Sequence, residues 1–197
     1  KDAKKIYIGG EGAPGLFEIN LKKKNTITKH PFKEIPNSVF SILQDKDNNI
    51  WIGTYRGGIH RWMINEDETT FKKDIIRRNP KLESSLPNNI IRDIFQDSKG
   101  NIWFATGNGL SKLPSNQINA KNPKFDNFKN NPLDKTSISH NYILTVFESK
   151  SGDIWIGTFG GGLNKLIAAT KEHKVRFKSY SKKDGLPNNV IKGILED

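Results

Sequence analysis

The chain has 197 residues, of which 34% are hydrophobic and 27% are charged. It contains no cysteine, which excludes disulfides and thiolate chemistry, and no apolar run reaches the roughly 20 residues that a membrane-spanning helix needs. Lysine and arginine total 32 against 21 acidic residues, so the formal net charge of +11 favours anionic partners, although a lysine-rich solvated surface explains the same excess.

The chain opens on a turn-rich apolar stretch, IYIGGEGAPGLFEI, in residues 6–19. A stronger pattern follows, in which three segments align without gaps. They read NSVFSILQDKDNNIW in 37–51, NIIRDIFQDSKGNIW in 89–103 and NYILTVFESKSGDIW in 141–155. The three segments end on Trp51, Trp103 and Trp155, which are 52 residues apart. A fixed period of this length indicates tandem structural repeats.

Each tryptophan is followed by a second shared stretch. It reads IGTYRGGIHRW from Ile52, FATGNGLSKL from Phe104 and IGTFGGGLNKL from Ile156. The opening segment is a weaker copy, with Tyr7 at the tryptophan place, and NVIKGILED from Asn189 starts a fifth copy.

Within one unit the pattern predicts four short strands, called a to d. Alternating Val, Ile and Phe after the first asparagine predict strand a, and the polar cluster after it predicts a hairpin turn. The NIWIGT stretch predicts strand b, and glycine pairs such as 57–58 and 161–162 allow a second turn into strand c. Strand d is less regular and shares only aromatic residues, in ITKHPF, TTFKKDI, PKFDNFK and VRFKSYS.

Four strands per unit without helical periodicity predict an all-β fold, a β-propeller of four-stranded antiparallel blades. The expected units are a partial blade with strands b to d in 1–36, full blades in 37–88, 89–140 and 141–188, and a first strand in 189–197. About four blades fit the length, and we favour a segment of a larger ring. A closed four-bladed ring and an eight-bladed ring made from two copies are the alternatives.

The tryptophans are predicted to be structural. An indole buried between neighbouring sheets removes roughly 150–250 Å² of surface from water, so core packing is favoured over ligand stacking for Trp51, Trp103 and Trp155. The repeated Gly53 and Gly157 belong to the same structural frame.

The repeat also resembles a known family. DSKGNIWFAT in 97–106 and SKSGDIWIGTFGGGL in 149–163, with LPNN before the first strand of a unit, resemble the two-component regulator propeller repeat. That repeat builds the periplasmic sensor region of hybrid two-component histidine kinases in Gram-negative bacteria that degrade polysaccharides. The opening copy departs from the pattern, because GGEGAPG stands where GTxGG is usual.

The resemblance implies a sensor that responds to a product of glycan breakdown outside the inner membrane. It implies a membrane helix and kinase domains in regions outside this segment, and therefore no phosphoryl transfer and no cofactor within it. We expect the segment to be no enzyme, and we expect an oligosaccharide partner, anionic in view of the +11 charge. Self-association of the sensor is a second expected contact, and no nucleic acid is expected.

Three local motifs could suggest a metal site or an enzyme, but a structural role is favoured for each. The stretch 45–49 resembles the start of a calcium loop but lacks the later glycine and glutamate, so a hairpin turn is favoured and no metal is expected. The same turn is similar to the Asp-box hairpin of sialidase propellers, which need an arginine cluster; here six arginines occupy unlike repeat positions. The histidines have no metal-ligand spacing; they are His30, His60, His140 and His173.

The repeat predicts where a ligand would bind. In an antiparallel meander the d-to-a connections and the b-to-c turns lie at the same end of every blade. The connections supply Asn37, Asn88, Asn89, His140, Asn141, Asn188 and Asn189, and the turns supply Tyr55, Arg56, Asn108 and Phe159.

The b-to-c turns vary from unit to unit on an otherwise repeated frame, as a selective site requires. Aromatic rings offer a flat surface to a sugar, and arginine can bind a carboxylate or sulfate with two hydrogen bonds. The predicted ligand-binding residues are Tyr55, Arg56, Asn89, Asn108, His140, Asn141 and Phe159. For the repeated asparagines, hydrogen bonds to backbone groups of the turn are the alternative.

These residues leave three functions open. The first is a ligand-sensing module, the second is a propeller that mediates sensor dimerisation without ligand contact, and the third is a lyase or hydrolase on the same scaffold.

Overall fold

The computed structural model describes residues 5–10, 15–22, 26–30, 38–65, 71–167 and 175–197. Within these ranges the chain forms fifteen strands and two short 3₁₀ helices, η1 (Ser115–Gln117) and η2 (Lys182–Asp184). The predicted all-β class is confirmed. No helix in the described part of the chain is long and apolar enough to cross a membrane.

The strands form four separate antiparallel sheets. The first sheet contains β1 (Lys5–Ile8), β2 (Leu16–Asn20) and β3 (Thr26–His30). The second contains β4 (Val39–Gln44), β5 (Ile50–Thr54), β6 (Ile59–Ile64) and β7 (Phe71–Ile76). The third contains β8 (Ile91–Gln96), β9 (Ile102–Thr106), β10 (Gly109–Leu113) and β11 (Asp126–Phe128). The fourth contains β12 (Ile143–Glu148), β13 (Ile154–Thr158), β14 (Leu163–Ile167) and β15 (Arg176–Tyr180).

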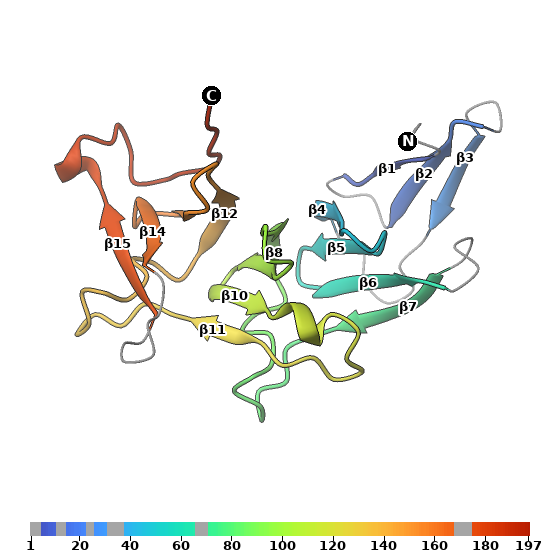
Figure 1. Cartoon of the computed structure of the whole chain (residues 1–197), viewed down its shortest axis with the longest axis horizontal. Coiled ribbons are helices and arrows are strands. Elements are labelled where there is room, and N and C mark those ends of the chain that lie inside the picture. Colours follow the sequence, from blue (N-terminus) through green and yellow to red (C-terminus); the bar gives the residue numbers. More distant parts are fainter. Residues whose placement is uncertain (1–4, 11–14, 23–25, 31–37, 66–70, 168–174) are drawn as a thin grey trace.

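The sheets follow one another as propeller blades along an open arc, with the first and last sheets at its two ends (Figure 1). In each four-stranded sheet the strands pair in chain order, as a meander. The first strands β4, β8 and β12 lie on the inner side of the arc, where β4 packs beside β8 and β8 beside β12. After the fourth sheet, Val190 forms a single antiparallel bridge with Phe159, and no strand is assigned in 191–197.

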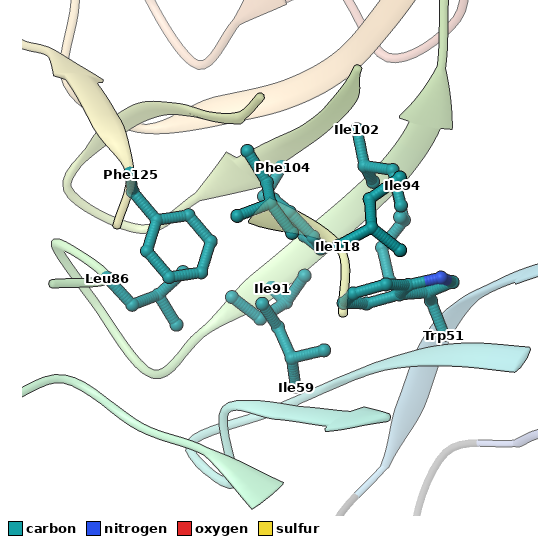
Figure 2. Packing of buried hydrophobic residues seen from close by; sticks show 10 residues of the cluster. Trp51, Ile59, Leu86, Ile91, Ile94, Ile102, Phe104, Ile118 and Phe125 are labelled. Atoms are coloured by element: carbon teal, nitrogen blue, oxygen red, sulfur yellow. The ribbon is translucent and has the colours of Figure 1, made fainter. Parts of the chain in front are cut away.

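The hydrophobic core lies between the sheets. In one cluster Trp51 of the second sheet packs with Ile94, Ile102 and Phe104 of the third sheet, and the ring centroids of Trp51 and Phe104 are 6.0 Å apart (Figure 2). A second cluster packs Trp103 against the fourth sheet in the same way. A third packs Tyr7 of the first sheet against Trp62 of the second, with centroids 6.5 Å apart.

The three tryptophans do not share one environment. Trp51 and Trp103 are 0% and 2% exposed, because each has the next sheet against its ring. Trp155 is only half-buried, since it belongs to the last sheet of the arc, and its ring contacts Tyr180 of that same sheet, with centroids 5.9 Å apart. The expectation of the same inter-sheet packing for Trp155 is therefore not met in this chain.

A carboxylate in the a-to-b turn holds each of the two buried indoles. Asp97 accepts a hydrogen bond from Trp103 Nε1 at 2.8 Å, and two more from the backbone and side-chain amides of Asn101. Asp45 does the same for Asn49 and for Trp51 Nε1, at 2.9 Å. These bonds satisfy the indole N–H, which a fully buried tryptophan requires. The Asp45 carboxylate thus binds groups of its own hairpin, in agreement with the prediction of a hairpin turn in 45–49.

The fourth sheet lacks this carboxylate. Ser149 stands at the corresponding position, and its hydroxyl contacts Ser151 and the backbone of Asp153 instead. The presence of aspartate therefore coincides with full burial of the indole six residues later.

The inner strands are joined by one shared carboxylate. Asp93 of β8 accepts from Ser41 Oγ of β4 at 3.3 Å, and from Thr145 Oγ1 and Val146 N of β12, both at 3.0 Å. It also accepts from its neighbour Ile94 N at 2.9 Å. One side chain thus links three consecutive blades near the axis of the arc.

A second contact between blades comes from Arg61. Its guanidinium binds both carboxylate oxygens of Asp74 in its own sheet and donates to the carbonyls of Ile118 and Ala120, next to η1 of the third sheet. Arg61 is 3% exposed, so its charge is paired with Asp74 and its N–H donors are used inside the protein.

Replacing Asp97 tests the coupling between turn and core. Asp97→Ala leaves the buried Trp103 N–H without its acceptor, so we expect a loss of about 1–3 kcal/mol in the free energy of unfolding, measured by urea denaturation. Ser149→Ala, at the corresponding turn, is the matched control and should cost clearly less. Equal losses for both variants would show that the indole bond contributes nothing.

Replacing Asp93 tests the link between the inner strands. Asp93→Ala leaves Thr145 Oγ1 and Val146 N without their acceptor, and the expected loss is again about 1–3 kcal/mol. Asp47→Ala, in an exposed turn, is the control for loss of one negative charge. The link would be refuted by a D93A protein that unfolds at the same urea concentration as D47A.

Candidate functional site

The b-to-c turns and the d-to-a connections meet at one end of the arc. In all three full blades a b-to-c turn donates a backbone hydrogen bond to the residues just before strand a: Tyr55 N to Ser38 O, Gly107 N to Ile90 O and Phe159 N to Tyr142 O. We call this surface the loop face. It consists of turns 55–58, 107–108 and 159–162 and connections 77–90, 129–142 and 181–190.

Glycine is required where these turns approach strand d. A Cβ at Gly58 would lie 2.3 Å from the carbonyl oxygen of Ile76, and one at Gly162 would lie 2.0 Å from that of Tyr180. Both residues have a φ of +79°. The frame of the turn is therefore set by glycine, and the residues before it are free to vary.

The repeated asparagines of the connections form hydrogen bonds with the backbone of the loop face. Oδ1 accepts from a backbone N–H near the start of the same connection, at 2.7 Å for Asn89, 2.8 Å for Asn141 and 2.8 Å for Asn189. The carbonyl of the same asparagine accepts from a glycine of the neighbouring b-to-c turn, as between Asn89 and Gly58 at 2.9 Å. Asn89 and Asn141 thus have a structural use at the loop face, while Asn37 lies outside the described residues.

The residues just before them form a second repeated bond. Asn88 and Asn188 accept from the backbone N–H two residues later, at 2.8 and 2.9 Å. His140 takes the same position and accepts from Tyr142 N through Nδ1 at 3.0 Å. An Nδ1 that accepts a bond leaves the proton of a neutral ring on Nε2. His140 therefore replaces an asparagine of the turn, and its Nε2 is on the side of Gly160.

Two aromatic residues of the b-to-c turns are open to solvent. Tyr55 is 37% exposed and Phe159 is 54% exposed. Each is held by one other ring, Tyr55 by Phe40 with centroids 5.7 Å apart and Phe159 by Tyr142 with centroids 5.9 Å apart. Of the predicted residues, these two present an apolar surface that a ligand can reach.

Asn108 and Arg56 complete the turns. Asn108 is half-buried, and its backbone N–H donates to Thr106 Oγ1 at 3.2 Å. Arg56 is exposed, and its guanidinium carbon lies 4.9 Å from the centre of the Tyr55 ring.

Sequence reasoning missed two residues of this face, Phe40 and Arg92. The guanidinium carbon of Arg92 lies 4.1 Å from the centre of the Phe40 ring. Both residues stand at the shift of register near the start of strand a, between Val39 and Ser41 and between Ile91 and Asp93. A bulge reorients the side chain of the extra residue, and alternation in the sequence does not reveal it.

Hollows occur at the junctions of the sheets. One, of about 670 Å³, lies between the third and fourth sheets near the a-to-b turns, and Trp103, Lys112 and Asp153 are among its lining residues. It is bordered by Leu166 and Val175, on either side of residues outside the described ranges. Another, of about 360 Å³, lies at the rim of the loop face, between residues 78–87 of the connection and the side chains of Asn127 and Lys129.

Among the ionisable groups with a shifted pKa, Asp184 lies on the loop face, in connection 181–190, where hydrogen bonds from Ser181 lower its pKa, and Tyr7, Lys73 and Asp153 lie elsewhere. A hydrogen bond from Lys165, with Nζ 2.7 Å from the carboxylate, lowers the pKa of Asp153. Burial, followed by the nearby Glu18 carboxylate, raises the pKa of Tyr7 to about 12. Among the described residues there is no group of three or more histidines and carboxylates that could hold a metal ion.

The comparisons with known proteins agree with the repeat. The family model described as "Two component regulator propeller" matches three segments, 33–56, 85–108 and 137–160. Each match runs from the connection before strand a through the tryptophan into the b-to-c turn.

Two relatives match over nearly the whole chain. A protein named histidine kinase P4, from Formosa agariphila, is 30% identical over 201 residues, which cover 98% of this chain and 13% of the relative. The extracellular domain of a putative hybrid two-component system from B. thetaiotaomicron is 29% identical, with a TM-score of 0.67, over 96% of this chain and 23% of that one. The chain thus spans less than a quarter of either relative.

A more distant match shows the fold alone. The virginiamycin B lyase from Staphylococcus aureus is 15% identical, with a TM-score of 0.58, over 93% of this chain and 53% of the lyase. The three matched segments and the four-stranded blades lead to one assignment: three units of this chain are two-component regulator propeller repeats.

Proposed function

We propose that this chain is a ligand-sensing segment of the sensor region of a hybrid two-component histidine kinase. The proposed signal is an oligosaccharide released from a polysaccharide. The similarity to histidine kinase P4 and to the extracellular domain from B. thetaiotaomicron supports the sensor role.

The observation that carries the ligand proposal is the pair of exposed rings on the loop face. Tyr55 and Phe159 lie in corresponding turns of the second and fourth sheets, each supported by another aromatic ring. Because each ring is already held in place, little side-chain entropy is lost when a sugar stacks on it. The glycines and asparagines around them are occupied in holding the turns, so the rings can vary without loss of the frame.

The proposal also has a cellular setting. The segment would lie in the periplasm, attached to the inner membrane by regions outside this chain, and the open arc would be part of a larger ring. Phosphoryl transfer would belong to other regions of the protein. Self-association of the sensor is part of the proposal, whereas nucleic acid is not a proposed partner.

Calorimetric titration of the intact protein with a panel of neutral and acidic oligosaccharides tests the proposal. We expect at least one of them to bind, and Tyr55→Ala and Phe159→Ala to weaken that binding by about two- to tenfold, since a well-placed aromatic contact contributes about 0.5–1.5 kcal/mol. Ile27→Ala, which removes an exposed apolar side chain from β3, is the control and should bind as the unmodified protein does.

Sedimentation of the same variants separates sensing from association. A dimer that no oligosaccharide alters, and that Tyr55→Ala or Phe159→Ala disrupts, would replace the sensing proposal by a protein-interaction function of the loop face. A panel without any binding oligosaccharide would refute the ligand proposal.

A further inference from the structure

Four of the six arginines of the chain lie on or next to the loop face, where the second and third sheets meet. They belong to the junction of the second and third sheets and are Arg56, Arg77, Arg78 and Arg92. Arg77 Nε donates to the carbonyl of Gly57, next to Arg56, and Arg78 N donates to Asn89 Oδ1, three residues before Arg92. Their sequence positions are unrelated within the repeat, so only the fold collects them.

Arg56 and Arg92 stand at the two ends of a row of aromatic rings. The guanidinium of Arg56 lies over Tyr55, Tyr55 packs edge-on against Phe40, and Arg92 lies over Phe40. The rings hold the two cations by cation–π attraction without neutralising their charge. Two planar groups with several N–H donors each are thus fixed beside an exposed aromatic surface.

These two guanidinium groups have no acceptor in the described part of the chain. Arg92 Nε is buried and forms no hydrogen bond there, and Arg56 and Arg92 make no ion pair with any described carboxylate. Arg61 shows the opposite case, because Asp74 and two carbonyls use its donors. A buried N–H without a partner costs free energy, and the fold bears this cost at Arg92.

The nearest acidic group of the inner strands is already in use. Asp93 follows Arg92 directly, but its two oxygens accept from Ser41, Ile94, Thr145 and Val146. Its carboxylate is therefore committed to joining the blades.

The backbone conformation of Arg56 also supports a functional role for this residue. Its φ is +69°, in the left-handed region that disfavours residues with a Cβ. Gly160 occupies the same place in the turn of the fourth sheet, with a φ of +111°. Arginine therefore stands where glycine would relieve the backbone, and strain of this kind is typical of functional positions.

We propose that Arg56 and Arg92 form a binding site for the carboxylate or sulfate groups of an acidic oligosaccharide. Each guanidinium would donate hydrogen bonds to an acidic group of the oligosaccharide, while a sugar ring lies against Tyr55 in the row between them. The site rests on the proposed sensing function and specifies its ligand class. Arg77 and Arg78 add positive potential around it.

The test compares the acidic oligosaccharide of the panel that binds most tightly with its carboxyl-reduced or desulfated counterpart, and uses inorganic sulfate as a probe without sugar. The intact protein should prefer the acidic form by about tenfold or more, because hydrogen bonds to charged groups contribute about 1.5–3 kcal/mol, which converts to roughly ten- to a hundredfold. Arg56→Gln and Arg92→Gln should each remove about tenfold of affinity for the acidic form and leave the neutral form unchanged.

Two further variants serve as controls. Arg176→Gln removes the same charge from β15, in the fourth sheet, and should leave both affinities unchanged. Arg56→Gly should lose affinity for the acidic form while its melting temperature stays equal or rises by about 2–4 °C, as expected for relief of about 1 kcal/mol of backbone strain. A purely structural arginine would lower the melting temperature instead.

The outcomes separate the site from the function. A neutral oligosaccharide that binds as well as its acidic form, or an equal loss for Arg176→Gln, would overturn the anion site and leave sensing intact. Sulfate binding that depends on Arg56 and Arg92, without binding of any oligosaccharide, would support the anion site and refute the proposal that the ligand is an oligosaccharide. Absence of both kinds of binding would refute both.

Discussion

Burial of an indole between neighbouring sheets is the interaction on which this structure depends. A four-stranded sheet alone exposes its apolar faces, and the clusters around Trp51 and Trp103 cover them by bringing in the next sheet. An indole can enter such a core only if its N–H keeps a partner, and Asp45 and Asp97 provide one from the turn six residues earlier. The packing of the blades therefore depends on the local geometry of these turns.

Polar links set the spacing of the blades on the inner side of the arc. Asp93 joins three inner strands, and side chains at the ends of these strands reach the a-to-b turn of the preceding blade, as from Lys46 N to Gln96 and from Ser98 N to Glu148. Such bonds are directional, whereas apolar packing is not, so they hold each blade at a defined position relative to the next. The loop face inherits this rigidity, because its turns are bonded to the starts of the inner strands.

The chain uses arginine in two different ways. Arg61 is enclosed and fully bonded, and its role is to connect the second sheet with η1 of the third. Arg56 and Arg92 rest on aromatic rings and form no ion pair with a carboxylate of the described residues. In the proposed anion site, an acidic group that pairs with them would add binding energy that a neutral group does not supply.

The sequence alone determined the repeat, the strands within each unit and the end of the blades where variable residues meet, because these follow from periodicity and from glycine and asparagine in turns. It also offered backbone hydrogen bonds as an alternative role for the asparagines, and these local bonds are present in the structure. It did not reveal that Trp155 lacks the packing of its counterparts, since that depends on a neighbouring sheet. The bulges at Phe40 and Arg92, and the gathering of Arg56 with Arg92, were decided only by tertiary structure. A shift of one residue in register redirects a side chain, and residues from different blades become neighbours only when the sheets pack.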